Sequence, residues 1–515
     1  MVSAAPSPPS PPHPARPRRR RRRLVAGIAL PLVALIGAGA VWFGVSSVRP
    51  TPPPPGTLTF SNELRVPALA ASTVVDGVRV FHLDVEEGRT EFVPQGATPT
   101  LGYDGSYLGP TLVAARGERV RVEVANRLDE STTVHWHGMH LPAAMDGGPH
   151  TPIRAGGTWS PEWTIDQPAA SLWYHPHLHG RTREQVDAGL AGMFLLTDDE
   201  ESSLSLPRTY GVDDVPLIVQ DRSFAADGAF AGGPSMQFDG VLGDTALVNG
   251  TVAPYFQATT ERVRLRLLNA SSARMYDFGF ADGRSFDLIA TDGGLLGAPV
   301  ASTSVPLSPG ERAEIVVSVR AGERTVLRSS APDPALNAGT AEFDVLELRA
   351  AASLAPSPPV PTALVALPPA EGADAAAERS FVMSGHTIND REMDLGRADV
   401  VAAVDTAEVW TVRNDNALPH SFHVHGTQFR IASVDGRSPP PRLSGWKDTI
   451  ALEQDREYRL LMRFEHADPN TPYMYHCHLL WHEDQGMMGQ FLVVEPGQAP
   501  DLRRPEGDDD DDHDH

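Results

Sequence analysis

The stretch Val120–Val124, VRVEV, decides the class of the fold because its apolar and charged residues alternate strictly. Side chains two apart in a β-strand point to the same face, so this pattern predicts a strand with one buried face. Similar short runs recur at Val263–Leu267, Ala313–Val319 and Phe491–Val494, and Gly, Pro, Asn and Asp residues separate them. Little helical periodicity lies between residues 57 and 496. The sequence therefore predicts an all-β protein built of antiparallel sandwiches.

The length of 515 residues exceeds one ordinary domain and indicates about three. A Pro- and Ala-rich stretch at 350–377 has the composition of an interdomain linker, and a weaker break lies near residue 205. We therefore expect sandwich domains at 57–204, 205–349 and 378–497. Residues 1–56 and an acidic, disordered tail at 498–515 would lie outside them.

Residues 1–56 combine an arginine run, an apolar stretch and a Pro-rich spacer. Arg18–Arg23 precede Leu24–Val48, 25 residues without a charge, which suffice for one hydrophobic helix across a bilayer. Arginines on that side place the N-terminus in the cytoplasm and the rest of the chain outside. Ala38–Ala40 also offers a signal-peptidase site, and the paired arginines permit twin-arginine export. We expect an exported protein, tethered by one membrane helix or, if cleaved, secreted or periplasmic.

The charge balance argues against one class of partner. The chain has 66 acidic and 43 basic residues, a net charge of −23, and its longest arginine run lies in the N-terminal segment. An acidic body binds a phosphate backbone poorly, so we expect no nucleic-acid partner. An RNA-binding arm at the N-terminus would leave the adjacent apolar run unexplained. The single cysteine, Cys477, excludes a disulfide framework within the chain.

Histidines gather in four short clusters, which hold ten of the 19 in the chain: HWHG (His135–Gly138), WYHPH (Trp173–His177), HSFHVHG (His420–Gly426) and HCHLLWH (His476–His482). Each contains an H-x-H pair, and on a strand such a pair directs two imidazoles to one point. Imidazoles suit borderline metals, copper among them. Cys477 would point away from its neighbours His476 and His478. A thiolate at one metal site would then be joined through the backbone to imidazoles at another.

Cys477 also has the neighbours that an electron-transfer copper site needs. A thiolate, two imidazoles and a weak axial thioether form the blue-copper set. His482 and Met487 follow the cysteine closely, and His420 supplies the second imidazole. Structural zinc sites use four ligands, usually with several cysteines, so this pattern favours copper.

The four motifs, together with GLAGMFLL (Gly189–Leu196) and GWKDT (Gly445–Thr449), resemble the three-domain multicopper oxidases, which include laccases, bacterial copper-efflux oxidases, bilirubin oxidase and the spore-coat laccase. The resemblance runs from about Thr57 to Pro496. It implies three cupredoxin-like Greek-key β-sandwich domains, with the middle one mainly a spacer and substrate-side wall. It also implies four copper ions: type 1 on His420, Cys477, His482 and Met487; type 2 on His135 and His423; and a type 3 pair on His137, His175, His177, His425, His476 and His478.

The resemblance further implies an activity. Phenolic or aromatic-amine substrates would give single electrons to type 1 copper, near an accessible edge of His420 or His482, and O2 would be reduced to water at the trinuclear cluster. The alternative reductant is Cu(I), as in the cuprous oxidases of copper homeostasis. Where those enzymes carry Asp and Met ahead of His420, this chain has Asn416 and Leu418, which disfavours the alternative because soft thioethers select Cu(I).

Two acidic residues match positions that relay protons in the copper-efflux oxidases, Asp146 and Glu483. For Asp146, a turn-forming role in MDGGP fits equally well. Two other classes share parts of the pattern. A cell-division scaffold of this fold has lost its copper ligands, whereas all of them are present here, and copper nitrite reductases lack the full type 3 histidine set. We expect O2 and a small reductant as partners, and the membrane if the N-terminal segment is retained.

Overall fold

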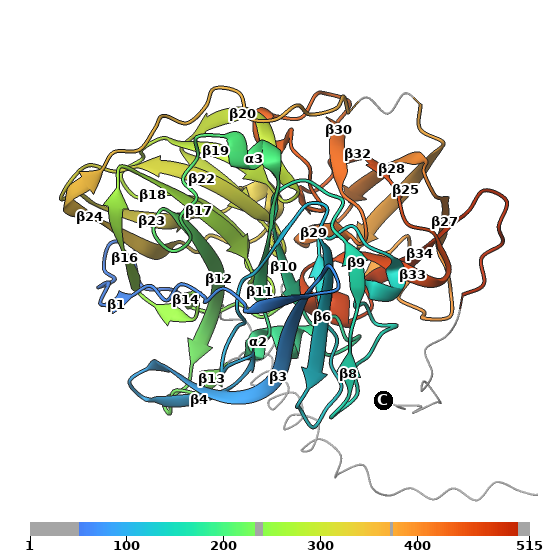
Figure 1. Ribbon diagram of the computed structural model, residues 1–515, viewed down its shortest axis with the longest axis horizontal. Helices are drawn as coiled ribbons and strands as arrows, with labels where there is room; N and C mark the ends of the chain where they lie inside the picture. Colours follow the sequence, from blue (N-terminus) through green and yellow to red (C-terminus); the bar gives the residue numbers. More distant parts are fainter. Residues whose placement is uncertain (1–50, 232–239, 371–373, 503–515) are drawn as a thin grey trace, which may run out of the picture. The chain divides into compact units, whose positions relative to one another are not determined.

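The computed structural model describes residues 51–231, 240–370 and 374–502, and these fold into six β-sheets (Figure 1). The sheets form three successive cupredoxin-like sandwiches, which confirms the predicted all-β class. The expected hydrophobic helix at 24–48 and most of the acidic tail lie outside the described residues. Among the residues that are described, no helix has the length and apolarity needed to cross a membrane.

The first sandwich packs a six-stranded sheet against a four-stranded one. Its alternating strand Arg119–Asn126 buries every second side chain, as the sequence predicted. The six-stranded sheet contains β2 (Ser72–Val75), β3 (Val78–Val93), β4 (Gly96–Tyr103), β6 (Arg119–Asn126), β8 (Thr158–Trp159) and β9 (Glu162–Thr164). The other runs in the order β5 (Leu112–Ala115), β11 (Gly192–Thr197), β10 (Ala170–His175) and β7 (His135–His137). The 3-10 turn η1 (Ala143–Met145) and helix α2 (Thr182–Ala188) lie in loops of the first sandwich, and helix α3 (Asp199–Ser203) follows β11 in the connection to the second sandwich.

The second sandwich has an eight-stranded and a six-stranded sheet. The larger contains β15 (Thr251–Val252), β14 (Thr245–Val248), β12 (Asp214–Phe224), β17 (Arg262–Asn269), β22 (Arg312–Ser318), β19 (Phe286–Thr291) and β20 (Gly294–Ser302), with β13 (Phe230–Ala231) paired to β12. The smaller runs in the order β1 (Asn62–Glu63), β16 (Pro254–Thr260), β24 (Phe343–Ala355), β23 (Arg324–Ser330), β18 (Tyr276–Phe280) and β21 (Ser304–Leu307). The 3-10 turn η2 (Pro334–Leu336) precedes β24.

The third sandwich has two five-stranded sheets. One runs in the order β26 (Thr387–Ile388), β25 (Ala377–Ser384), β28 (Ala407–Asn414), β32 (Glu457–Arg463) and β30 (Phe429–Val434). The other runs β27 (Val400–Ala403), β34 (Met488–Val494), β33 (Asp468–Cys477), β29 (His420–Val424) and β31 (Thr449–Leu452). The 3-10 turn η3 (Pro441–Leu443) and helix α4 (Leu480–Asp484) lie in the loops.

The antiparallel pairing expected of such sandwiches is accompanied by parallel pairs, which lie at equivalent places in each sandwich. β3 pairs in parallel with β6, β12 with β17, and β25 with β28. In each case the intervening chain crosses to the opposite sheet, as β5, β16 or β27, before it returns. A strand that returns after such a crossover enters its sheet in the original direction. The three sandwiches therefore repeat one topology.

The structure differs from the expected domain borders at β1 and at both ends of the expected linker, and the three-domain division itself stays a prediction. β1 comes from the first segment but pairs with β16 of the second sandwich, and its blue ribbon lies beside the green strand in Figure 1. β24 continues to Ala355 and β25 begins at Ala377, so both ends of the expected linker are strand. Leu364 in the middle of that stretch is buried against the second sandwich. The alanine-rich ends of this stretch thus extend strands β24 and β25, because neighbouring strands are available for pairing there.

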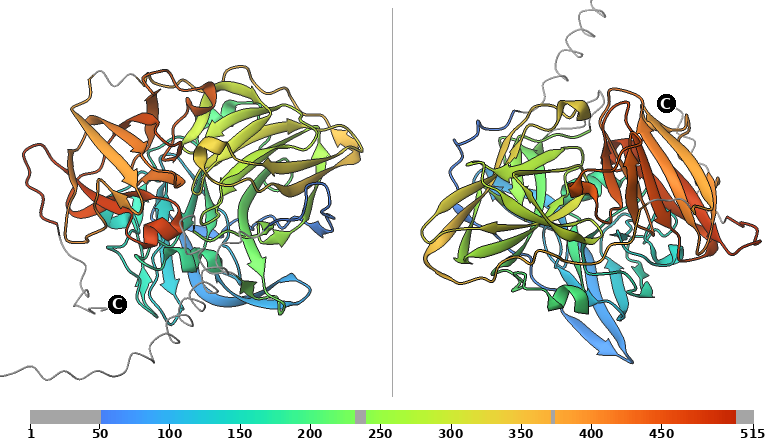
Figure 2. Two further views of the ribbon diagram at one scale, coloured as in Figure 1. Left: turned by 180° about the vertical axis from the view of Figure 1, so that it is seen from behind. Right: turned by 90° about the horizontal axis from the view of Figure 1, so that it is seen from above.

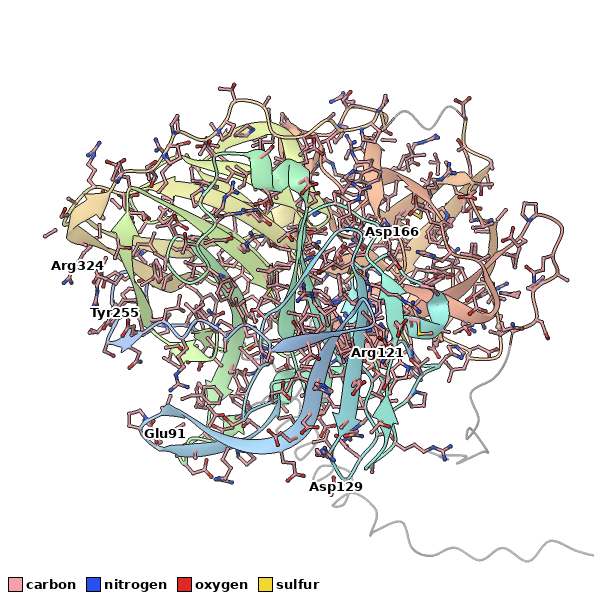
Figure 3. All side chains as sticks on the ribbon, viewed as in Figure 1. Glu91, Arg121, Asp129, Asp166, Tyr255 and Arg324 are labelled. Carbon is pink, nitrogen blue, oxygen red and sulfur yellow. The ribbon has the colours of Figure 1, made fainter. Side chains whose placement is uncertain are left out.

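The first sandwich contacts both of the others. Strand β12 is buried on both faces, because Val215, Leu217 and Val219 enter the core of the second sandwich while Ile218 packs with Met193 and Leu195 of β11. On the other side, η1 contacts β33 and α2 contacts α4 of the third sandwich. Asp166, before β10, lies next to the third sandwich in Figure 3, and its carboxylate is 3.6 Å from His466 Nε2. The second and third sandwiches lie side by side in both views of Figure 2, joined at β19 and η3.

Candidate metal centre

Adjacent strands bring the histidine clusters together in pairs. In the first sandwich β7 pairs with β10, which places His135 opposite His175. In the third, β29 pairs with β33, which places His423 opposite His476. All ten histidines of the four clusters are buried, with at most 1% of each residue exposed. Direct cross-strand neighbours lie about 5 Å apart, so each sheet contributes a compact group of imidazoles.

The expectation that whole H-x-H pairs lie on strands holds only for His135 and His137. β10 ends at His175, β29 at Val424 and β33 at Cys477, so His177, His425 and His478 lie just beyond strand ends. Release from the strand lets these rings turn away from strict alternation. In two of these pairs, His175 with His177 and His476 with His478, the two imidazoles enter different groups of three.

Eight imidazoles converge where the first and third sandwiches meet. His137 Nδ1 lies 3.3 Å from His175 Nε2 and 3.2 Å from His478 Nε2, forming one group of three. A second group joins His177, His425 and His476, with His476 Nε2 3.1 Å from each of the other two Nε2 atoms. The remaining two, His135 and His423, have buried Nε2 atoms without a hydrogen-bond partner.

Hydrogen bonds at the outward-facing ring nitrogens show which nitrogen of each ring carries the proton. Nδ1 of His135 donates to Asp146 O at 2.9 Å and Nδ1 of His423 to Asp448 O at 2.9 Å. Nδ1 of His175 donates to Pro176 O at 2.8 Å. The inward Nε2 atoms therefore carry lone pairs, and two facing lone pairs cannot form a hydrogen bond.

The donor set fits metal ions. Ligand nitrogens about 2.0 Å from a first-row divalent ion, at tetrahedral angles, are about 3.3 Å apart, which matches the separations within both groups of three. Burial lowers the pKa of His175, His423 and His425 well below the usual value, and lowers that of His478 to about 3. Neighbouring imidazoles lower the first three further. These rings are neutral at physiological pH, the state in which imidazole binds metals.

A separate group surrounds the cysteine. Cys477 Sγ lies 3.6 Å from both His420 Nδ1 and His482 Nδ1, and all three residues are fully buried. Burial raises the pKa of the Cys477 thiol to about 12, so copper binding must displace a proton. Met487 is also fully buried in this core, and its carbonyl accepts a hydrogen bond from Cys477 N at 3.1 Å. A thiol, two imidazoles and a methionine that contacts the cysteine through its backbone are the residue types of a blue-copper site.

The expected exposed edge on His420 or His482 is not observed, because both residues are fully buried. The ring of His386 packs on His482 with centroids 4.8 Å apart. Ahead of His420, Asn416 Oδ1 accepts a hydrogen bond from Leu418 N at 2.8 Å and shapes the loop. The position that carries an acid in copper-efflux oxidases therefore has a structural role in this chain.

Both acidic residues singled out in the sequence lie against the histidines. Asp146 Oδ2 accepts from His425 Nδ1 at 2.7 Å, at the end of η1, so the residue both closes a turn and contacts the cluster. Glu483 lies 3.4 Å from His177 Nδ1 and 3.3 Å from His476 Nδ1. Burial, with a contribution from Asp484, raises the pKa of Glu483 well above its usual value.

Sequence reasoning missed the residues behind His137. Asp448 Oδ1 accepts from His137 Nε2 at 3.0 Å, and Arg312 of the second sandwich donates to both oxygens of that carboxylate. The segment GWKDT, which contains Asp448, is recognised only as similar to the family, and the sequence predicts no role for the aspartate. The sequence did offer one signal for this ion pair: Arg312 begins the largely apolar strand β22, and a charged residue in a buried strand usually has a partner of opposite charge.

Comparisons with known proteins agree with this geometry. Models of the multicopper oxidase family match residues 84–201 and 360–497. The chain is 36% identical over 441 residues to the multicopper oxidase mco of Staphylococcus epidermidis, covering 84% of this chain and 93% of that protein. It is 37% identical over 430 residues to the cell division protein FtsP of Edwardsiella tarda, covering 81% and 90%.

Among solved structures, the laccase-like multicopper oxidase CueO of Ochrobactrum sp. superposes with a TM-score of 0.78 at 35% identity, covering 84% of this chain and 100% of that one. That enzyme is described as having oxidase activity towards lignin model compounds and lignosulfonate. Extended sequence similarity, a shared fold and a complete set of buried copper-type donors point the same way. The chain belongs to the multicopper oxidase family, and its similarity to the oxidases of that family supports a copper-binding oxidoreductase.

Proposed function

We propose that this protein is an exported, laccase-like oxidase that takes single electrons from phenolic or aromatic-amine substrates and reduces O2 to water. The observation that carries the proposal is the position of Cys477, which belongs to one donor group while its neighbours His476 and His478 belong to the two groups of three. Two short covalent paths thus connect the cysteine group to the histidine cluster. Separate sites for electron entry and for O2 suit a reaction that collects four electrons before releasing water.

The donor groups support four copper ions. His420, Cys477 and His482, with Met487, would hold type 1 copper, and His135 and His423 the type 2 ion. The two groups of three would hold the type 3 pair: His137, His175 and His478 in one, His177, His425 and His476 in the other. Copper supplies reversible one-electron chemistry at these positions. The protein keeps the donors neutral, orients them and excludes water from them.

Asp146 and Glu483 are proposed to deliver protons to the cluster. Each is almost fully buried and lies within hydrogen-bond or ion-pair distance of a cluster histidine. Asp146→Asn keeps the shape of the residue and its role in the turn but removes its ability to take up and release a proton. We expect slower O2 reduction with unchanged copper content. Unchanged turnover would leave Asp146 with the turn role alone.

The similarity to an oxidase with activity towards lignin model compounds supports phenols as reductants. Asn416 and Leu418 support the same choice over Cu(I), because no thioether or acid is present at those two positions. Export rests on the arginine run and apolar segment of residues 1–48, which would either tether the enzyme to the outer face of the membrane or be cleaved.

Oxygen uptake tests the proposal. The copper-loaded full chain, in detergent where needed, is offered a methoxyphenol and Cu(I) in parallel, with peroxide assayed. We expect rapid uptake with the phenol and no peroxide. Uptake with Cu(I) alone would assign the protein to copper homeostasis, and no uptake with either reductant would exclude both oxidase roles.

A further inference from the structure

Arg312 is a fully buried arginine at the place where all three sandwiches meet. It opens β22 of the second sandwich, and all five of its side-chain N–H groups have acceptors. Nε donates to Ser171 O of the first sandwich at 2.9 Å, and the two Nη atoms donate to Gly310 O and Asp292 O, each at 3.0 Å. The remaining two N–H groups hold Asp448 of the third sandwich at 2.7 and 2.6 Å. A guanidinium with every donor occupied is fixed in position.

Asp448, held in place by Arg312, contacts the ring of His137. Its Oδ1 lies 3.0 Å from His137 Nε2, and Thr449 Oγ1, 3.1 Å from the same nitrogen, donates to Asp448 Oδ1 at 2.9 Å. A carboxylate only accepts hydrogen bonds, so the proton of the His137 ring belongs on Nε2. The lone pair of His137 is then on Nδ1, the atom that faces His175 and His478.

This arrangement is opposite to that of other histidines in the cluster. His135, His175, His423, His425 and His476 all have a protein acceptor at Nδ1 and turn Nε2 inward. A neutral imidazole in water exists as two tautomers. A cluster in which one histidine offers the lone pair of Nδ1 while the others offer that of Nε2 therefore needs a specific contact that selects the tautomer. The Arg312–Asp448 ion pair has the geometry to select this tautomer of His137.

Gly138 shows that the sequence makes room for the pair. The residue follows His137 with φ of +87°, and a Cβ atom there would lie 2.6 Å from Asp448 Oδ2 and 2.7 Å from Arg312 Nη2. The glycine that ends the HWHG motif is thus required both by the backbone conformation and by the buried ion pair. A further ion pair fixes the surroundings, since Lys447 Nζ bridges Asp292 at 2.8 Å and Glu311 at 2.9 Å.

We propose that Arg312 and Asp448 are positioning residues that hold His137 in its Nε2–H tautomer, so that the second sandwich takes part in building the type 3 site. This inference rests on the proposed copper-oxidase function for its consequence, but the tautomer itself is a property of the metal-free chain. The middle sandwich is therefore more than the spacer expected from the sequence. Its arginine sets the ligand atom of a histidine that belongs to the first sandwich.

The direct test reads the tautomer without copper. The metal-free full chain is labelled with 15N-histidine, and His137→Gln assigns the His137 signals by their loss. We expect Nε2 to carry the proton in the wild type and a substantial Nδ1–H population in Asp448→Asn. A wild-type His137 protonated at Nδ1, or an unchanged tautomer in Asp448→Asn, would overturn the inference.

Copper affinity, measured by competition with a chelator, tests the consequence. We expect Asp448→Asn to weaken binding at one trinuclear position by about 10- to 100-fold while the colour of the Cys477 site remains. Asp221→Asn is the matched control, because Asp221 is fully buried, accepts from Arg274 Nε at 2.6 Å and touches no cluster histidine. Equal copper loss in both variants would overturn the positioning role, since a general loss of stability would then explain it. Correct tautomers in a wild-type chain that binds no copper would instead contradict the proposed function alone.

Discussion

Gly310 offers a sharp test of how closely the second sandwich approaches the histidine cluster. The residue has φ of +87° in the turn before β22, and a Cβ atom there would lie 3.0 Å from two carbons of the His478 ring and 3.1 Å from Nε2. Ordinary carbon contacts begin near 3.4 Å, so Gly310→Ala would displace the ring by about 0.4 Å. His478 Nε2 faces His137 Nδ1 at 3.2 Å, and the displacement would distort that group of three.

The expected magnitude follows from two separate effects. Alanine at positive φ costs about 1 kcal/mol of stability, whatever surrounds it. A misplacement of 1 Å at a reacting centre costs about a hundredfold in rate, so 0.4 Å corresponds to about a sixfold loss of O2 reduction. The assay is oxygen uptake with a methoxyphenol, combined with copper content and thermal unfolding. The colour of the Cys477 site should remain, because the three atoms nearest to the added Cβ all belong to His478.

Gly322→Ala separates the two effects. Its turn has the same construction: Glu323 N bonds Arg320 O at 3.0 Å, as Glu311 N bonds Ser308 O at 3.0 Å. Gly322 has φ of +74°, but nothing lies within 4 Å of the position that a Cβ atom would take there. Both variants should lose similar stability, and only Gly310→Ala should lose activity. A Gly310→Ala enzyme with wild-type uptake, or equal activity losses in both variants, would refute the argument that this turn fixes the His478 ring.

Three further predictions concern stability and electron entry. Glu314→Gln should destabilise the protein by about 3 kcal/mol in denaturant unfolding, because Glu314 is buried between Arg264 and Arg266; Glu162→Gln, at a partly exposed pair, should cost less than about 1 kcal/mol, and equal costs would contradict this. Burial raises the pKa of Glu314, but the two arginines outweigh it and lower the value to about 2, so its stabilisation should persist above about pH 4.5 and be lost as pH falls towards 2. Glu314→Gln should lack that loss, and an identical acid profile would exclude Glu314 as the source. Cys477→Ser should abolish colour and phenol oxidation while copper remains in the histidine cluster; retained phenol oxidation would show that electrons enter elsewhere.

The sequence by itself determined the class of the fold and the candidate metal donors. Alternation such as that of β6 is a local property, since it depends only on which side chains face the core. The H-x-H motifs and the single cysteine likewise indicate candidate donors, because few other chemistries require these residues at this spacing. The same local signals could not distinguish antiparallel from parallel pairing, since a parallel pair such as β3 and β6 depends on where the chain crosses between sheets.

Only the tertiary structure decided how the donors are grouped and which atom each presents. His175 and His177 are two residues apart, yet they enter different groups, because partners from the third sandwich select among the rings. The ligand atom of His137 depends on Asp448, 311 positions away, and that carboxylate depends on Arg312 in another sandwich. No local pattern encodes such a choice. A buried tautomer is fixed by the acceptor that folding brings to it, and that acceptor comes from a distant part of the chain.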